Sequence, residues 1–182
     1  EYKFESEEIT FMEKILVLVA GGIESEKLAF EDLDILNVLG SLAQKLEMIE
    51  ETIVFYQAVV KIDSKNVVSM YNLGLLYAKI GKFDEAIQQL KPILQYDESH
   101  LATIIKLGDM FFHGKNDFDS AVEYYRRAFD LQPDDCQTGL KLASVLSKKE
   151  SFEEATHIIF TLLKDNNEDP DLWLNYAVLS SL

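Results

Sequence analysis

The chain has 182 residues, of which 48% are hydrophobic, and only 8 Gly and 3 Pro. This composition excludes a disordered or fibrous chain and predicts one folded domain with a buried core. The formal net charge of −15 at pH 7 argues against nucleic acid and anionic membrane surfaces as partners, because phosphate groups are bound by clustered Lys and Arg. Acidic residues concentrate in residues 1–51, where we expect a solvated surface or, alternatively, the steering of a basic partner.

The cysteine content and the length of the apolar runs predict the cellular location of the protein. The single cysteine, Cys136, cannot form a disulfide within the chain, which suits a reducing compartment. The longest apolar run, residues 15–20, is too short to span a bilayer, and no signal peptide pattern is visible. We therefore expect an intracellular location, cytoplasmic or nuclear, without membrane insertion. The chain begins without Met and ends inside an apolar pattern, so we interpret it as a piece of a longer protein.

The N-terminal segment, residues 1–32, is expected to hold one helix. Its apolar residues recur at helical spacing: Ile9, Met12, Ile15, Leu16 and Val19. Gly21 and Gly22 would stop this helix, and Leu28 and Phe30 in the following loop would pack back on the array that residues 33–182 form. We expect this segment to act as a degenerate repeat or as a cap.

A pair consisting of a large apolar residue and a small residue recurs along the remainder of the chain. Its copies are Leu39-Gly40, Leu73-Gly74, Leu107-Gly108, Leu142-Ala143 and Tyr176-Ala177. The spacing is 34 residues, except for 35 between Gly108 and Ala143, which we attribute to one extra residue in the turn after Gly114. A fixed period of this length is typical of a repeat architecture.

Each repeat is predicted to contain two helices. In the second unit, one helical face is formed by Met70, Leu73, Gly74 and Tyr77, and a second by Ala86, Leu90 and Ile93. Gly81 lies between them and suits the left-handed position that ends a helix. Small residues at the Gly74 position and at the Ala86 position would let two helices approach closely.

The pattern resembles the tetratricopeptide repeat, whose 34-residue period carries Leu-Gly, Tyr, Ala and Pro at fixed places. The third unit matches at Ile104, Leu107, Gly108, Phe111, Ala121, Tyr125, Ala128 and Pro133. The resemblance implies an all-α fold, a right-handed superhelix of antiparallel helix pairs. We expect four units and part of a fifth: residues 33–66, 67–100, 101–135, 136–169 and 170–182.

The first helix of each unit usually lines the concave face of such an array. The candidate binding residues on that face are Val68, Tyr71, Asn72, Leu75, Ile105, Lys106, Asp109, Phe112, Leu140 and Lys141. Apolar anchors beside two lysines suit a helix or an extended peptide with a few acidic groups. These apolar residues could instead pack against the neighbouring turn or against a missing part of the same chain. A possible interface at the end of the array comprises Trp173, Leu174 and Tyr176.

One subclass of the family clamps the carboxylate of chaperone C-termini with Lys, Asn and Arg. The matching positions are Asn37, Ser41, Asn72, Ala102 and Lys106, or, one unit later, Tyr71, Leu75, Lys106, Gln137 and Lys141. Neither set supplies the basic cradle, so we do not expect this role.

No catalytic pattern is visible, and we expect no enzyme, cofactor or metal. The three histidines are scattered, and neither a metal-ligand spacing nor a Gly-rich phosphate loop occurs. Acidic pairs at residues 50–51 and 153–154 are expected to lie at the starts of helices, where their negative charge interacts favourably with the positive end of the helix dipole.

The sequence thus predicts a protein-interaction scaffold that binds another protein or a peptide, without nucleic acid. Alternatives are a structural or self-associating segment, with homo-oligomers formed through the array ends, and a regulatory domain attached to an enzyme elsewhere in the chain.

Overall fold

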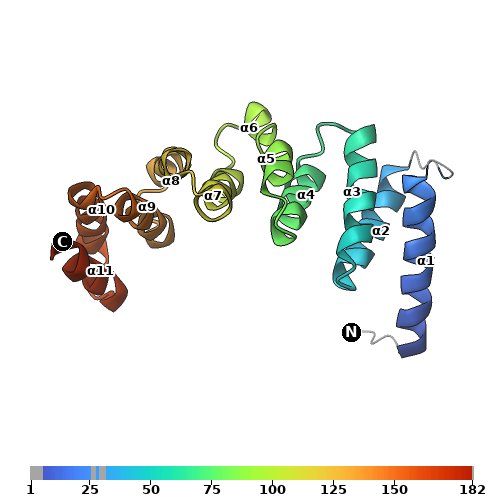
Figure 1. Ribbon diagram of the computed structural model, residues 1–182, viewed down its shortest axis with the longest axis horizontal. Helices are drawn as coiled ribbons and strands as arrows, with labels where there is room; N and C mark the ends of the chain where they lie inside the picture. The colour runs from blue at the N-terminus through green and yellow to red at the C-terminus, as the bar shows by residue number, and fades with distance from the viewer. Residues whose placement is uncertain (1–5, 26–27, 29–31, 182) are drawn as a thin grey trace. The chain divides into compact units, whose positions relative to one another are not determined.

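The computed structural model describes residues 6–25, 28 and 32–181 (Figure 1). Over these residues the chain forms helices joined by short turns, with no strand, which confirms the all-α prediction. The chain divides into two compact units, residues 1–80 and 81–182. Among the described helices, none is both long and apolar enough to cross a membrane.

The described residues of the first unit form four helices: α1 (Ser6–Glu24), α2 (Leu33–Lys45), α3 (Ile49–Ile62) and α4 (Val67–Lys79). In Figure 1, α1 lies beside α2 and α3, and α3 also contacts α4. Their apolar faces meet in a core that includes Leu16, Leu36, Ala43, Phe55 and Val59, each at most 1% exposed. Burial of these faces, rather than helix propensity alone, holds such short helices together.

The glycine pair does not stop α1, so that prediction is wrong. The helix continues through Gly21 and Gly22 to Glu24. It ends where Ser25 donates both its backbone N–H and its hydroxyl to the Gly21 carbonyl, at 3.1 and 2.7 Å. The side chain of Leu28 lies directly against Gly22 of α1, within the N-terminal segment itself, so its packing on the repeat array stays a prediction. Phe30 lies outside the described residues.

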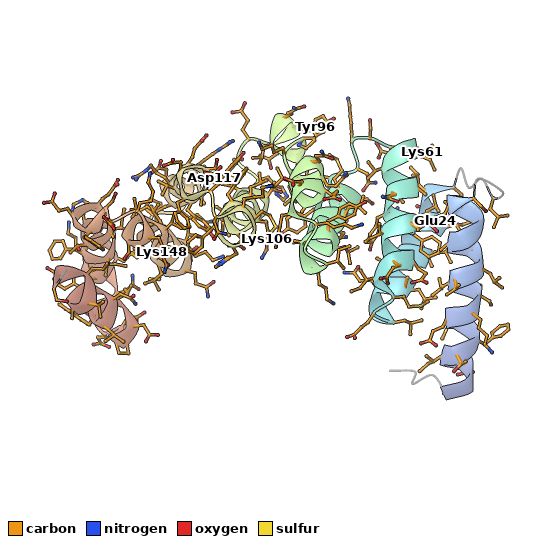
Figure 2. All side chains as sticks on the ribbon, viewed as in Figure 1. Glu24, Lys61, Tyr96, Lys106, Asp117 and Lys148 are labelled. Atoms are coloured by element: carbon orange, nitrogen blue, oxygen red, sulfur yellow. The ribbon has the colours of Figure 1, made fainter. Side chains whose placement is uncertain are left out.

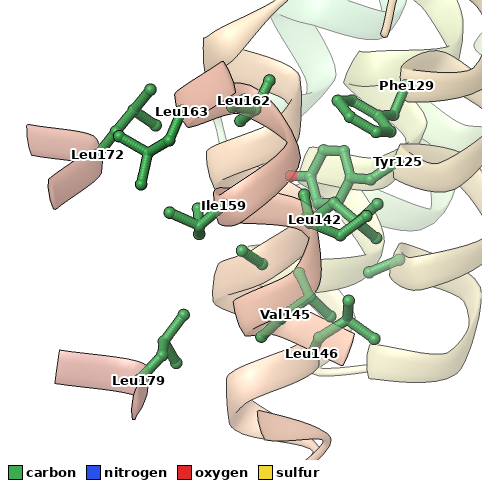
Figure 3. Close-up of a cluster of buried hydrophobic side chains, with 14 residues drawn as sticks. Tyr125, Phe129, Leu142, Val145, Leu146, Ile159, Leu162, Leu163, Leu172 and Leu179 are labelled. Carbon is green, nitrogen blue, oxygen red and sulfur yellow. The ribbon is translucent and has the colours of Figure 1, made fainter. Parts of the chain in front are cut away.

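The second unit contains the remaining helices: α5 (Phe83–Leu90), α6 (Ile93–Tyr96), α7 (Leu101–Asp109), the π-helix η1 (Met110–Lys115), α8 (Phe118–Leu131), α9 (Cys136–Lys148), α10 (Phe152–Asp165) and α11 (Pro170–Ser180). Successive helices α7 to α11 pack on one another. Figure 3 shows part of their shared core, in which Tyr125, Leu142, Ile159 and Leu162 are nearly or fully buried.

Several of the described helices begin at residues whose side chains cap them. A side-chain oxygen at the N-cap accepts a backbone N–H in α2, α4, α8, α9 and α11, from Asp32, Asn66, Asp117, Asp135 and Asp169 respectively. Such caps satisfy donors that have no partner within the helix. The acidic pairs at residues 50–51 and 153–154 lie in the first turns of α3 and α10, as predicted.

The extra residue of the third repeat enlarges a helix rather than the turn. The first helix of the second repeat, α4, has 13 residues, whereas α7 and η1 have 9 and 6. Only Asn116 and Asp117 then connect η1 to α8. A π turn holds one residue more than an α turn, because its hydrogen bonds join residues five apart rather than four. The inserted residue therefore lies in η1, a few residues before the turn where the sequence predicted it.

The turns between paired helices share one backbone conformation. Glu47, Gly81, Asn116 and Glu150 have φ of 58°, 77°, 52° and 61°, and each follows the first helix of its repeat. The predicted left-handed role of Gly81 is therefore confirmed. The same position is filled by Glu in two repeats, although glutamate adopts this conformation at a steric cost.

Small residues in the first helices allow close approach, as predicted. A Cβ at Gly40 would lie 2.9 Å from Cε1 of Tyr56, and one at Gly108 would lie 2.6 Å from Cε1 of Tyr125. Both distances are too short for a real contact. A tyrosine on the second helix of the repeat therefore occupies the space that a side chain would need.

Candidate protein-interaction surface

In the first unit, the candidate residues lie on α4. Val68 is 69% exposed, and Tyr71, Asn72 and Leu75 are partly buried. The buried face of the same helix, with Met70 and Leu73, points into the unit. The four candidates are thus accessible in this unit, as a binding face requires.

A small pocket includes two of these candidates. It has a volume of about 150 Å³ and is lined by Gln44, Glu47, Ile49, Thr52, Asn72, Leu75, Leu76 and Lys79. The hydroxyl of Tyr56 donates to Oε1 of Gln44 at 3.0 Å, which orients that amide. The pocket combines apolar side chains with two amides and one charge of each sign, so it can take an apolar side chain and hydrogen-bond its backbone.

In the second unit, the candidate residues come from α7, η1 and α9. Ile105, Lys106, Phe112, Leu140 and Lys141 are all partly buried, and the three apolar ones pack against the hydrophobic core of the unit. The alternative that they pack within the chain is therefore correct for part of each side chain. The accessible parts leave an apolar surface beside two ammonium groups.

Asp109 differs from the other candidates because it is only 8% exposed. Its Oδ1 accepts hydrogen bonds from the Tyr125 hydroxyl at 2.7 Å and from the Lys141 ammonium at 2.5 Å. Its Oδ2 accepts one from the Lys106 ammonium at 3.2 Å. We call these four residues the Asp109 cluster; it joins α7, α8 and α9, and Figure 2 labels Lys106 on α7.

The electrostatics of the Asp109 cluster follow from burial and hydrogen bonding. Burial alone would raise the pKa of the Asp109 carboxyl, but the hydrogen bonds from Lys141, Tyr125 and Lys106 outweigh it, so the pKa is lowered. Burial, followed by the hydrogen bond to Asp109, raises the pKa of the Tyr125 hydroxyl. At neutral pH the Asp109 carboxyl is therefore ionised, and the Tyr125 hydroxyl stays protonated and donates a hydrogen bond to it.

The candidates at the array end are exposed to different degrees. Trp173 is 50% and Leu174 is 64% exposed, while Tyr176 is partly buried. The Tyr176 ring lies 6.0 Å from the rings of both Trp173 and Phe160, so α10 and α11 present a continuous aromatic surface. The Trp173 indole N–H donates to the Asn167 carbonyl at 2.7 Å, which holds the ring in place.

Sequence reasoning missed part of this surface. Val38, 65% exposed on α2, borders a shallow apolar hollow of about 360 Å³ with Asn37, Ser41, Leu42 and Lys45. The repeat register contained a signal, because Val38, Asn72, Lys106 and Lys141 occupy the same place in successive units. The central position of Asp109 between two lysines was also missed, although its spacing of three residues from Lys106 was visible.

The described residues contain no group of three or more His, Cys, Asp or Glu that could hold a metal ion. His100 is used in a cap, since its Nδ1 accepts the backbone N–H of Thr103 at 3.3 Å. Burial and the charges of Asp169 and Asp135 raise the pKa of the Cys136 thiol. A thiol with a raised pKa is a poor nucleophile at neutral pH.

The arrangement so far defines a class, a protein built from repeated pairs of helices. Models of the tetratricopeptide repeat family match residues 33–66, 55–88 and 103–135. The chain is a tetratricopeptide repeat protein.

Relatives with curated names cover the chain in part. The chain is 28% identical over 142 residues to "Tetratricopeptide repeat-containing protein trd-1" of Caenorhabditis elegans, which covers 78% of this chain and 18% of that protein. It is 24% identical over 125 residues to human "Protein O-mannosyl-transferase TMTC3" (69% and 14%). It is 33% identical over 82 residues to "BBSome complex member BBS4" of Bos taurus (45% and 15%). The chain spans less than a fifth of the length of each.

Solved structures show the same fold. MamA superposes with a TM-score of 0.73 and 20% identity, over 82% of this chain and 81% of that one. YrrB, described as "a TPR protein with an unusual peptide-binding site", superposes with a TM-score of 0.70 and 19% identity, over 88% and 81%. At these identities the similarity establishes the fold, an α-solenoid of helix pairs.

Proposed function

We propose that this protein is an interaction scaffold that binds a peptide or a helix of another protein through the accessible sides of the first helices of its repeats. The observation that carries the proposal is the accessible apolar surface on α4 in one unit and on α7, η1 and α9 in the other. Exposed apolar side chains grouped on a folded protein usually mark a partner site. The predicted limits of the repeats are part of the proposal, because they make each of these helices the first helix of its repeat.

The comparisons support this proposal without identifying a partner. YrrB is described as having a peptide-binding site, and BBS4 as a member of a complex. TMTC3 is named as a transferase, so a regulatory role beside a catalytic domain is the alternative for a longer protein. The candidate residues provide apolar contacts and ion pairs but no nucleophile with an adjacent base, which favours binding.

Selection from a displayed library of random peptides tests the proposal. Enriched peptides should bind the parent and lose at least about tenfold in affinity with Val68→Asp or Ile105→Asp, because each change places a charge in an apolar contact. The control is Leu131→Asp, which adds the same charge at a side chain 45% exposed on α8. Far-UV circular dichroism should show that all variants fold. A library without enriched peptides, or peptides that bind all three variants like the parent, would exclude the proposal.

A second function, self-association, is favoured by the aromatic surface of α10 and α11. Leu174 and Val178 are 64% and 52% exposed there, and a second copy could cover them. Light scattering over a range of concentrations would show a dimer in the parent and a monomer in Leu174→Ser. A parent that is monomeric throughout would exclude this candidate while leaving peptide binding untouched.

A further inference from the structure

We infer that the outer side of α1 is a docking surface for a basic amphipathic helix of another protein, and that one Lys or Arg of that helix enters a notch between α1 and α3. The inference goes beyond the proposed function, because α1 precedes the predicted repeats and is not one of their first helices. We call this surface the α1 face; it comprises an apolar stripe and the adjoining notch.

The apolar stripe consists of α1 side chains that point away from the core of the first unit. Leu16 and Ala20 are buried, whereas Phe11, Ile15 and Leu18 lie on a different side of the helix, with Phe11 65% and Leu18 74% exposed. Their spacing of four and three residues places them in one line along α1. A partner helix matches such a line with its own apolar residues at i, i+3, i+4 and i+7.

The notch beside this stripe suits a basic side chain. It has a volume of about 160 Å³, and its lining includes the apolar Val17, Ala20 and Val54 and the carboxylates of Glu24, Glu50 and Glu51. Lys and Arg place their aliphatic stems along apolar surface and keep the charged group at its polar edge. The notch offers both parts of this environment.

Gly21 connects the stripe to the notch. It follows Leu18 by one helical turn and also lines the notch. A Cβ at Gly21 would have no heavy atom within 4 Å, so the backbone of α1 is open to a partner at this point. A bound helix can therefore contact Leu18 and reach the notch without meeting a side chain at residue 21.

The carboxylates of the notch have no cation of their own. Within the described part of the chain, none of Glu24, Glu50 and Glu51 forms an ion pair with Lys or Arg. Glu50 and Glu51 lie in the first turn of α3, where the helix end supplies only about half a positive charge. Three carboxylates therefore leave an excess of negative charge.

The end of α1 adds to this negative charge. Glu24 lies in the last turn of α1, which contains no basic residue, and Figure 2 labels it there. The C-terminal end of a helix carries a partial negative charge, so an acidic residue at this position is unfavourable and a cation is favourable. A basic side chain in the notch would thus interact with the carboxylates and with the helix end together.

The charge selects the class of partner. A purely apolar partner would cover carboxylates without supplying a counter-charge, which is costly. A second copy of this chain that docked by the same face would place its own glutamates opposite these ones. A helix with apolar residues on one side and Lys or Arg beside them complements both the stripe and the notch.

The test is an NMR titration of the ¹⁵N-labelled chain with two helical peptides. The probes are acetyl-LKKLLKLLKKLLKL-amide and its counterpart with Glu in place of every Lys. We expect the Lys probe to shift the amide signals of α1 and of the first turn of α3, and to bind at least about tenfold more tightly than the Glu probe. Equal affinities, or shifts confined to other helices, would overturn the inference.

Variants with matched controls separate this site from the overall attraction of an acidic protein for a basic peptide. Glu24→Gln should weaken binding of the Lys probe about threefold, whereas Asp130→Asn, which removes an equal charge from the last turn of α8, should not. Leu18→Ser should weaken it about fivefold or more, whereas Ile62→Ser, at the opposite end of α3 from the notch, should not. Equal effects of each variant and its control would refute the site.

The melting temperature distinguishes binding from a structural role of Glu24. Because an acidic residue at the end of α1 is unfavourable, Glu24→Gln should leave the melting temperature unchanged or raise it while it weakens binding. A lower melting temperature with unchanged binding would show that Glu24 acts only within the fold, and would overturn the inference.

Other occupants of the α1 face would give different results. A dimer of the parent that becomes a monomer in Leu18→Ser, measured by light scattering, would assign the face to a second copy and overturn the inference. Loss of binding in a form of the protein extended before residue 1 would assign it to the same chain, with the same consequence. Binding of the Lys probe should survive Val68→Asp and Ile105→Asp, so the peptide site of the proposed function can fail while the α1 face stands; loss of binding in these variants would refute a separate surface.

Discussion

Replacing Gly108 by Ala should destabilise the second unit, although alanine is the better helix former. A Cβ at this position would lie 2.6 Å from Cε1 and 2.7 Å from Cδ1 of Tyr125, where ordinary contact begins at 3.4 Å. The Tyr125 ring would have to retreat by about 0.8 Å. It has little room to do so, because it is fully buried and its hydroxyl is hydrogen-bonded to Asp109.

The expected magnitude combines three effects. Overpacking of a buried site costs about 1–3 kcal/mol, and the higher helix propensity of alanine returns about 1 kcal/mol. Weakening the hydrogen bond from Tyr125 to an ionised carboxylate adds about 1–2 kcal/mol. We therefore expect the free energy of unfolding to fall by about 1–4 kcal/mol, which lowers the melting temperature by about 2–16 °C for a chain of this size.

Urea unfolding followed by far-UV circular dichroism measures this change, with Gly21→Ala as the matched control. Gly21 lies in α1, and a Cβ there would have no heavy atom within 4 Å. That variant should gain about 0.5–1 kcal/mol from helix propensity alone. If Gly108→Ala is as stable as the parent, the close approach of Tyr125 to Gly108 does not limit the packing, and the reasoning is wrong.

Four further outcomes are expected. Tyr125→Phe removes one hydrogen bond that lowers the pKa of Asp109, so acid unfolding should begin at a higher pH than in the parent. Because the folded pKa of Asp109 lies below its ordinary value of 3.8, its stabilisation should be complete at neutral pH and be lost as the pH falls below about 4; a melting temperature that does not fall more steeply there than in Asp109→Asn would contradict this. Glu150→Gly should raise the free energy of unfolding by up to about 1 kcal/mol, because glycine adopts the left-handed backbone conformation of this turn without steric strain. The urea midpoint should rise accordingly, and a lower midpoint would contradict this prediction. Cys136 should react with a disulfide reagent more slowly at neutral pH than a free model thiol does, and faster reaction would contradict its raised pKa.

The repeat and its close contacts could be predicted from the sequence because they are properties of spacing. A small residue at Gly40 and Gly108 indicated where helices touch, and Tyr56 and Tyr125 now fill those places. The left-handed turn at Gly81 followed from the same register. These features repeat, so each copy supports the interpretation of the others.

Features that occur once were not predictable in the same way. The count of residues showed an insertion in the third repeat, but whether a turn or a helix absorbs it depends on packing, which placed it in η1. The ion pair between Lys141 and Asp109 joins residues 32 apart in the chain, and its geometry depends on how α7 and α9 stack. Which face binds a partner is likewise a property of the surface that no period specifies.

The interruption at Pro92 has a consequence for hydrogen exchange. Proline lacks the N–H that continues a helix, and it separates α5, with 8 residues, from α6, with 4. Neither is long enough to persist alone in water, so this region depends on the burial of Ala86, Leu90 and Ile93. Local opening should therefore take less free energy here than in α8 and α10, and the amides of α5 and α6 should exchange with deuterium before those of α8 and α10.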